Sequence, residues 1–184
     1  MVVDVGTGSG RALLRRAARE PQTLFIGIDA DARGMLEASR RAARSSQRGG
    51  TPNVIFLAAA AKALPGPLAG RAGEVVVALP WGSLLRALLG PDPALIAALT
   101  ALLNPGGVLE LLLTSAERDA AAGGLVLDDG EAAVLAKRYA AFGLDVLEFR
   151  PATRTDVERL SSGWGARLGV AARRQGWVFR LRIS

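Results

Sequence analysis

MVVDVGTGSG, residues 1–10, and LFIGID, residues 24–29, together decide the fold. Each begins as an apolar run suited to a buried strand. The first run enters glycines at positions 6, 8 and 10, which let the backbone turn sharply and let a ligand approach it, because no Cβ blocks either move. The second run ends in a carboxylate, Asp29. A strand, a glycine turn, a helical stretch and a second strand in this order predict the start of an α/β sheet.

The position of Asp29 indicates what the glycine turn holds. It lies about 20 residues beyond the turn, where an acidic side chain accepts hydrogen bonds from both ribose hydroxyls of an adenosine-containing cofactor. The alternative is that the turn merely closes a βα unit. Because strand, turn, helix, second strand and terminal acid are all in register, we favour an adenosyl cofactor over that alternative.

The glycine spacing and Asp4 separate two kinds of cofactor. Gly-x-Gly-x-Gly departs from the Gly-x-Gly-x-x-Gly fingerprint of dinucleotide sites and resembles the S-adenosylmethionine loop of class I methyltransferases. A pyrophosphate favours a helix N-terminus and nearby cations, whereas the sulfonium and ammonium of S-adenosylmethionine favour carboxylates such as Asp4. We expect this cofactor to contact Asp4, Gly6, Thr7, Gly8, Gly10 and Asp29.

The composition bounds the size of the protein and the kind of partner. With 184 residues, 50% of them hydrophobic, and no shift of composition along the chain, we expect one domain over residues 1–184. The 23 Lys and Arg against 17 Asp and Glu give a net charge of +6, which favours a polyanionic partner. A high-GC genome would explain the preference for arginine over lysine, but not the net excess of cations.

The residue types that are missing narrow the chemistry. The chain has neither cysteine nor histidine, which excludes disulfides, thiol nucleophiles, common zinc sites and the usual general base at neutral pH. Methyl transfer suits this inventory, because the cofactor supplies the electrophile and the protein positions a nucleophile. We expect no metal. No secretory signal and no apolar run of about 18 residues is present, so we expect a cytoplasmic protein.

Alternating apolar and helical patterns predict a doubly wound, mostly parallel sheet with a Rossmann-like topology. Strands are expected at Val2–Gly6, Leu24–Asp29, Asn53–Ala58, Glu74–Leu79 and Val108–Thr114. Helical patterns lie at Gly10–Glu20, Asp31–Ser46, Leu64–Gly70 and Pro93–Leu103, with Asp31 and Asp92 as N-caps and Asn104–Gly107 as a stop. Ligands bind at the carboxyl ends of such strands, where we expect the glycine turn, Asp29, Ala60, Ala61 and Pro80 to meet.

The C-terminal part follows a different pattern. We expect a helix at Glu131–Phe142 and a strand at Leu144–Arg150. Residues 177–183 alternate with the period of a strand that buries one face, so we expect the last two strands to be antiparallel, with Trp177 in the core. Residues 151–176 are rich in Arg, Ser and Gly and are predicted to form a long functional loop.

Two other tryptophans are candidates for binding a base. Trp81 follows the fourth expected strand in Pro80-Trp81-Gly82-Ser83, and Trp164 lies between serines and glycines in the long loop. An indole at a loop tip exposes a large apolar surface unless a flat partner covers it, and stacking on a base contributes roughly 1–3 kcal/mol. The alternative, that they fill the core, is the reading that we accept for Trp177.

Several motifs together carry a closer resemblance. They are VDVGTG at 3–8, GID at 27–29, GG at 49–50 with PN at 52–53, LP at 64–65, PWGSLL at 80–85, and Ser162-x-Trp164 with RL at 167–168. Over nearly its whole length the chain resembles the aminoglycoside-resistance 16S rRNA methyltransferases that modify N1 of adenine 1408 in the decoding site. The PWGSLL stretch and the late Ser-x-Trp are its specific part.

This resemblance implies a fold, a reaction and a set of residues. The fold is a class I S-adenosylmethionine-dependent methyltransferase with an antiparallel last strand, and the substrate is 16S rRNA in the assembled 30S subunit. The family's two tryptophans sandwich the flipped adenine, which places that role on Trp81 and Trp164. Its rRNA-contacting arginines correspond to Arg167 and Arg174. We expect Arg173, Ser83 and Ser162 to join them at the substrate, and the enzyme to be a monomer.

Two residues depart from the family pattern. Ser9 stands where the family has an aspartate, and Lys62 stands where it usually has a glutamate shortly before Leu-Pro. The family also carries residues before its first strand, so we expect that cover to be absent here. A methyltransferase of another RNA base or of a small molecule, or a non-catalytic RNA-binding relative, is the alternative.

Overall fold

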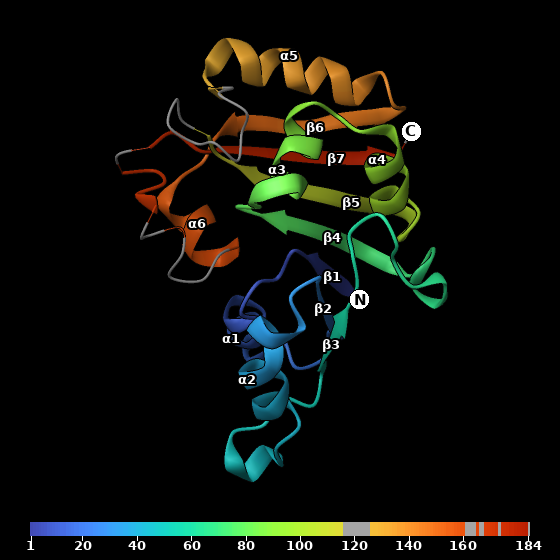
Figure 1. Cartoon of the computed structure of the whole chain (residues 1–184), viewed down its shortest axis with the longest axis vertical. Helices are drawn as coiled ribbons and strands as arrows, with labels where there is room; N and C mark the ends of the chain where they lie inside the picture. The colour runs from blue at the N-terminus through green and yellow to red at the C-terminus, as the bar shows by residue number, and fades with distance from the viewer. Residues whose placement is uncertain (116–125, 161–164, 166–167, 173, 184) are drawn as a thin grey trace.

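The fold is a seven-stranded sheet between two layers of helices (Figure 1). The computed structural model describes residues 1–115, 126–160, 165, 168–172 and 174–183. The strand order is β3-β2-β1-β4-β5-β7-β6, in which β7 alone runs antiparallel to its neighbours. The strands are β1 Val2–Val5, β2 Phe25–Asp29, β3 Val54–Ala58, β4 Ala72–Ala78, β5 Leu103–Leu113, β6 Leu144–Pro151 and β7 Trp177–Ile183.

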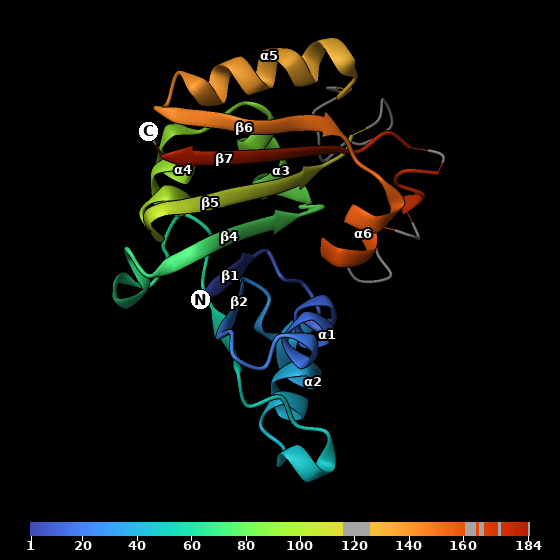
Figure 2. The same cartoon turned by 180° about the vertical axis from the view of Figure 1, so that it is seen from behind.

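The helices cover both faces of this sheet. Helices α3, α4 and α5 pack on one face, and α1, α2 and α6 pack on the other, which Figure 2 shows from behind. Their bounds are α1 Arg11–Arg19, α2 Ala32–Ala42, α3 Gly82–Leu89, α4 Pro93–Thr100, α5 Asp129–Ala140 and α6 Arg154–Leu160, with short 3-10 helices at η1 Ser46–Arg48 and η2 Gly66–Leu68. The predicted doubly wound sheet with an antiparallel last strand is confirmed.

Alternate residues of the central strands meet the two helix layers. Val75 and Val77 of β4 and Leu109 and Leu111 of β5 join the apolar core under α3, α4 and α5. The intervening residues face α1 and α6 and include carboxylates. One row of paired residues crosses five strands on that face: Asp4, Val76, Glu110, Arg180 and Glu148. The same strands therefore have one fully apolar face and one face that carries charge.

Several expected boundaries were wrong. The helix expected to end at Leu103 ends at Thr100, because Leu103 pairs with Ala72 and begins β5. The Asn104–Gly107 turn signal thus lies inside β5, where the ladder shifts register opposite Ala72 and Glu74. Residues 64–70 form only the short η2 instead of a helix. The sequence analysis also missed α3, which begins after Trp81 without a side-chain cap.

Helix α6 lies in the interval predicted to be a long loop, so that prediction was wrong for Arg154–Leu160. Its start is a reciprocal cap: the Thr153 amide donates to Asp156 Oδ2 at 2.8 Å, and the Asp156 amide donates to Thr153 Oγ1 at 3.3 Å. Arg150 binds the same carboxylate at 2.6 and 2.9 Å and holds the pKa of Asp156 well below its usual range. A Thr-x-x-Asp pattern was readable in the sequence, but it opens only two helical turns.

Hydrogen bonds join the chain on either side of residues 116–126. The Leu127 amide donates to Ser115 Oγ at 2.8 Å, and the Trp177 indole donates to the Leu127 carbonyl at 3.1 Å. Trp177 is buried, as predicted, and stacks on Phe149 with ring centroids 5.2 Å apart. Ser115, at the end of β5, and Leu127, before α5, are thereby fixed to the sheet.

Over the described ranges, no single helix is long and apolar enough to cross a membrane. Helices α3 and α4 pass a test of length and composition only as a pair bent by 97°. Their leucines, among them Leu85, Leu88, Leu95 and Leu99, are buried in the core under the sheet.

Candidate active site

A cavity of about 790 Å³ opens at the carboxyl ends of β1, β2 and β4. It is lined by residues 4–9, 12, 28–30, 59–62, 78–81, 83, 84 and 87, together with Leu95 and Leu160. The ends of parallel strands and the loops that follow them meet here, as in other doubly wound sheets. Most of the residues expected to bind a cofactor therefore come together around one space.

Asp4 places a buried carboxylate at this cavity. The residue is 7% exposed, and Thr7 Oγ1 donates to its Oδ2 at 2.7 Å. Burial raises the pKa of Asp4 to about 6, against the lowering effect of the Thr7 hydroxyl. Among the described residues no donor reaches Oδ1, and Asp4 is one of the residues that line the cavity. A desolvated carboxylate with a free oxygen favours a cationic group.

Asp29 organises the glycine turn and faces the same cavity. The Gly8 amide donates to its Oδ2 at 2.8 Å, and the Asp31 amide donates to its Oδ1 at 2.8 Å. These two bonds fix the carboxylate at the end of β2. Each oxygen keeps a second lone pair, so the group can still accept from ribose hydroxyls.

The three glycines of the turn have different surroundings. All have positive φ, between 57° and 79°, which favours glycine. A Cβ on Gly8 would meet nothing within 4 Å, whereas one on Gly6 would lie 2.9 Å from Leu84 Cδ2. On Gly10 it would lie 2.4 Å from the Phe56 ring, and Gly10 is absent from the cavity lining. A ligand can therefore approach the backbone at Gly8, while Gly10 serves the packing of α1 against β3.

The cavity wall formed by the residues after β3 is apolar and ends in an ion pair. Ala60 and Ala61 line the cavity as predicted, next to Lys62. The Lys62 ammonium lies 2.5 Å from Asp92 Oδ2, and the Leu95 amide donates to Asp92 Oδ1 at 3.1 Å. Lys62 holds the pKa of Asp92 below its usual range. Asp92 was predicted only as the cap of α4, and its ion pair with Lys62 was not predicted.

Trp81 lies at the cavity where β4 gives way to α3. Its side chain is 55% exposed, and Pro80 and Ser83 line the cavity beside it. Leu79 has a φ of 49°, a left-handed conformation that is strained for a branched residue before proline. Its amide donates to the Leu112 carbonyl at 2.8 Å, which helps to hold that conformation. Strain of this kind gathers at functional sites.

Of the remaining predicted residues, the structure describes only Arg174. Ser162, Trp164, Arg167 and Arg173 are outside the described residues. Arg174 is described: its amide donates to the Gly169 carbonyl at 2.9 Å, and it is not part of the cavity lining. Leu84 and Leu160 line the cavity from α3 and α6 and were not predicted, because only the tertiary packing brings them there.

The cavity has the donor and acceptor set that S-adenosylmethionine requires. Asp4 would hold its cationic amino-acid part, and Asp29 its ribose. The apolar wall at Ala60 and Ala61 suits its adenine, and the space over Gly8 allows close approach to the backbone. Ser9, where an acid was expected, also lines the cavity, so the site has one carboxylate fewer than the family pattern.

The sequence is similar to a defined family over almost its whole length. The family model described as NpmA: 16S rRNA (adenine(1408)-N(1))-methyltransferase matches residues 1–182. The 16S rRNA (adenine(1408)-N(1))-methyltransferase of Streptoalloteichus tenebrarius is 34% identical over 173 residues, which cover 91% of this chain and 80% of that protein. The Escherichia coli protein of the same name is 27% identical over 180 residues, or 94% of this chain and 82% of that protein.

Solved structures agree with the sequence relatives. The 16S rRNA methyltransferase KamB matches with a TM-score of 0.87 at 33% identity, covering all of this chain and 87% of that one. A mutant of the 16S rRNA (adenine(1408)-N(1))-methyltransferase from Catenulisporales acidiphilia, with its cosubstrate SAM, matches with a TM-score of 0.86 at 31% identity and covers 100% of this chain and 85% of that one. With the glycine turn, the two carboxylates and Trp81 around one cavity, this chain belongs to the 16S rRNA (adenine(1408)-N(1))-methyltransferase family.

Proposed function

We propose that this protein transfers a methyl group from S-adenosylmethionine to N1 of adenine 1408 in the 16S rRNA of the assembled 30S subunit, and thereby confers aminoglycoside resistance. The observation that carries the proposal is a family match over residues 1–182 together with a cavity that presents Asp4, Asp29 and Trp81. The cofactor supplies an electrophilic methyl group when bound. The chain needs to place the acceptor nitrogen in line with it.

Trp81 is the described residue best placed to hold the target base. Adenine N1 is paired or stacked in folded RNA, so the base must leave the stack to be methylated. A half-exposed indole at the cavity gives the extruded base a flat apolar surface. We assign the opposite face of the base to Trp164, and further substrate contacts to Ser83, Ser162, Arg167, Arg173 and Arg174. N1 attacks with its own lone pair, so a chain without histidine can perform the step.

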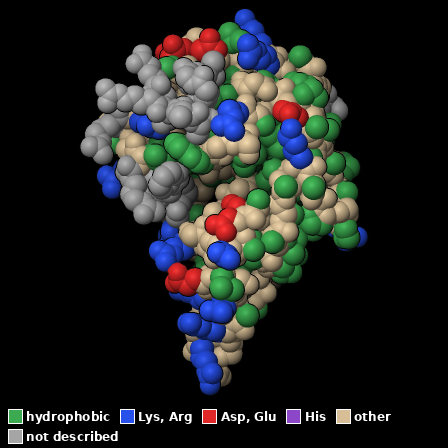
Figure 3. Space-filling view, viewed as in Figure 1, with side chains coloured by type: hydrophobic (Ala, Val, Ile, Leu, Met, Phe, Trp, Pro, Cys, Tyr) green, Lys and Arg blue, Asp and Glu red, His purple; other side chains and the backbone are tan. Residues whose placement is uncertain are grey.

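An arginine-rich surface supports the choice of a folded RNA. From Ala32 to Gly50 the chain has one acid, Glu37, and five exposed arginines: Arg33, Arg40, Arg41, Arg44 and Arg48. Figure 3 shows basic side chains gathered along the lower, tapered end of the molecule, where α2 and η1 lie. Contacts of this kind with phosphates add affinity without reading sequence. We assign this surface to docking on the ribosomal subunit.

The same proposal extends to the state of the enzyme. We assign it a single domain, a monomeric form and a cytoplasmic location, and no requirement for a metal ion. One continuous sheet with a core on each face supports the single domain. A ribosomal substrate supports the location, and a methyl donor that brings its own electrophile removes the need for a metal.

The test is methyl transfer to intact 30S subunits with labelled S-adenosylmethionine, followed by mapping with reverse transcription. Methylation at N1 blocks base pairing, so we expect a new stop at adenine 1408. Label at another position would retain the methyltransferase and contradict the target. An absence of label from 30S subunits and from free 16S rRNA would contradict the proposed activity.

Trp81→Ala tests the assignment of the base platform. Loss of one stacking surface predicts a fall in the rate of roughly 5- to 150-fold, which corresponds to about 1–3 kcal/mol. Trp81→Phe is the matched control and should retain most of the rate, because it keeps a flat aromatic ring. An unchanged rate for Trp81→Ala, with the fold intact by circular dichroism, would contradict the stacking role.

A further inference from the structure

Arg16 of α1 and Arg159 of α6 lie near Asp4, on the face of the sheet that these two helices cover. A small cavity of about 10 Å³ is lined by Asp4, Arg16 and Arg159, among others. Ala12 and Leu160 line both this space and the cofactor cavity. Asp4 therefore lines both the proposed cofactor site and the small space that Arg16 and Arg159 line.

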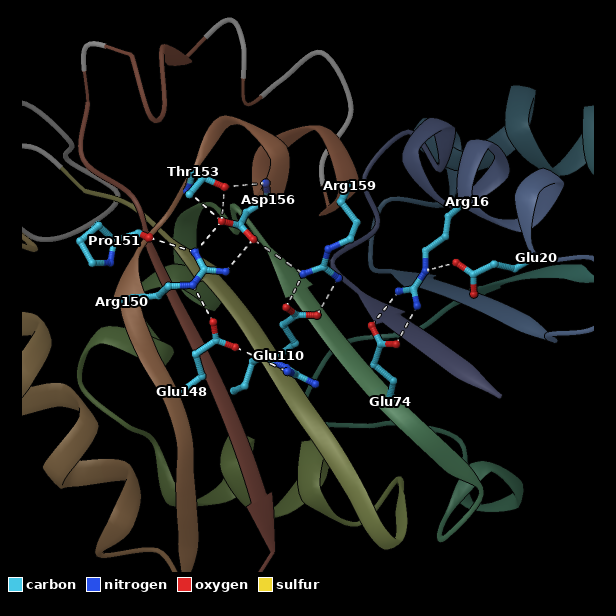
Figure 4. A network of polar contacts seen from close by, with 11 residues as sticks. Arg16, Glu20, Glu74, Glu110, Glu148, Arg150, Pro151, Thr153, Asp156 and Arg159 are labelled. Carbon is cyan, nitrogen blue, oxygen red and sulfur yellow. Dashed lines mark hydrogen bonds and ion pairs between the residues drawn. The ribbon is translucent and has the colours of Figure 1, made fainter.

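Each arginine is bound to a carboxylate of its own (Figure 4). Arg16 NH1 and NH2 donate to the two oxygens of Glu74, each at 2.7 Å, and its Nε donates to Glu20 at 3.0 Å. Arg159 NH1 and NH2 donate to Glu110 at 3.0 and 2.5 Å. Both pairs are bidentate, which is the strong and directional form of this contact. Neither arginine is a hydrogen-bond donor to Asp4 among the described contacts.

The two glutamates occupy positions that otherwise suit apolar residues. Glu74 lies in Ala72–Ala78 and Glu110 in Leu103–Leu113, both on the sheet face that also carries Asp4. Glu110 is only 3% exposed. A carboxylate in such a place is costly unless it is paired, and apolar replacement of a buried ion pair is often neutral or stabilising. Stability alone therefore does not explain why charge is placed here.

The effect on Asp4 offers a reason. Arg16 lowers the pKa of Asp4 and Glu74 raises it, so both groups are close enough to act on that carboxylate and they oppose each other. Without Glu74, Arg16 would keep its Nε bond to Glu20, and its two freed Nη groups would have Asp4 as a nearby desolvated anion. A guanidinium bound to Asp4 would repel an ammonium group brought to the same carboxylate, because like charges in a desolvated site repel each other.

We propose that Glu74 is a positioning residue: it holds the Arg16 guanidinium away from Asp4, and so keeps the Asp4 carboxylate available for the ammonium group of S-adenosylmethionine. The inference rests on the proposed contact between Asp4 and the cofactor, and it is independent of the RNA target.

The test compares two ligands in binding calorimetry with the full chain. S-adenosylhomocysteine carries the amino-acid part, and 5′-methylthioadenosine lacks it. For Glu74→Gln we expect S-adenosylhomocysteine to bind about tenfold more weakly or worse, and methylthioadenosine to bind as it does to the wild type. Equal losses for both ligands would show a distorted cavity and overturn the proposal.

Removal of the arginine gives the decisive variant. Arg16→Gln combined with Glu74→Gln removes the released cation, while Arg159 stays bound to Glu110, so we expect affinity for S-adenosylhomocysteine to return to within about threefold of the wild type. A purely structural role predicts that the double variant binds as weakly as Glu74→Gln or more weakly, and that result would overturn the proposal. If Glu74→Gln does not fold, the double variant with near wild-type affinity still supports it, and weak binding by a folded double variant contradicts it.

Two controls separate the possible failures. Glu158→Gln removes a comparable carboxylate, bound to Arg154 at 2.8 Å on the exposed side of α6, and should leave both affinities unchanged. Asp4→Asn should weaken S-adenosylhomocysteine. An unchanged affinity there would contradict the role of Asp4 itself, and with it the proposal for Glu74. No RNA is present, so the outcome does not depend on the target base.

Discussion

The two faces of the central sheet are built from the same strands and have different tasks. On the face under α3, α4 and α5, residues such as Leu111, Phe179 and Tyr139 are fully buried. On the other face, β4 and β5 place Glu74 and Glu110 among valines and leucines, and arginines from α1 and α6 bind them. The apolar face supplies stability, since burial of apolar surface is the main favourable term in folding. The charged face carries Asp4, whose pKa is raised mainly by burial and is affected in opposite directions by Arg16 and Glu74.

This comparison predicts the largest loss of stability on the apolar face. Phe179 is fully buried between Phe149 and Tyr139, with ring centroids 5.3 and 5.9 Å away. Phe179→Ala should lower the free energy of unfolding by about 3–5 kcal/mol, measured by urea denaturation. Its neighbour Arg180 points to the charged face and is the matched control. If Arg180→Ala cost as much, the contrast between the faces would be wrong.

The second prediction concerns a substitution on the charged face that raises the free energy of unfolding. Burial raises the pKa of Asp4 to about 6, so the folded protein holds this proton more tightly than the unfolded chain, and the carboxylate costs stability once pH rises from about 4 to above 6. Asp4→Asn should therefore raise the free energy of unfolding at pH 8, by up to about 3 kcal/mol, while it weakens S-adenosylhomocysteine.

The pH dependence provides the control for that variant. Near pH 4 Asp4 is protonated in the folded protein, so the variant and the wild type should have similar stability there. The wild type should lose stability relative to the variant as pH rises to about 6, and the difference should then stay constant. If Asp4→Asn were less stable than the wild type at pH 8, burial of the ionised Asp4 carboxylate would not be destabilising, and the prediction would be wrong.

The smallest expected effect concerns a single hydroxyl on the apolar face. Tyr139 OH donates to the Leu88 carbonyl at 2.9 Å, near the end of α3, where the last carbonyls of a helix lack partners. Tyr139→Phe should cost about 1 kcal/mol of unfolding free energy. It should leave ligand affinity unchanged, because Tyr139 is not among the residues that line the cavity. If Tyr139→Phe reduced ligand affinity by more than it reduced stability, the contact between Tyr139 and Leu88 would contribute to ligand binding.

The strands were predictable because their pattern depends on local sequence. Five apolar runs, the glycine turn and the alternation in residues 177–183 gave the sheet and its antiparallel end. Helix α3 was missed because Trp81 offers no capping side chain, and α6 because it has only seven residues. The early start of β5 depends on the pairing of Leu103 with Ala72, which is a tertiary contact.

The site was predictable where topology alone gathers its residues. The positions of Asp4, Asp29, Ala60, Ala61, Pro80, Trp81 and Ser83 at strand ends place them around one cavity. The ion pair of Lys62 with Asp92 could not be predicted, because it joins residues 30 positions apart. The lone glutamates at 74 and 110 were a readable sign, since a charge in a buried strand requires a partner, but the sequence does not say which arginine provides it.

The hydrogen bonds from the Leu127 amide to Ser115 and from the Trp177 indole to the Leu127 carbonyl meet at one residue. Leu127 thereby connects the chain after β5, the approach to α5 and the first residue of β7. Both bonds use the main chain of Leu127. The junction of these three elements therefore depends on backbone geometry and not on the polarity of that side chain.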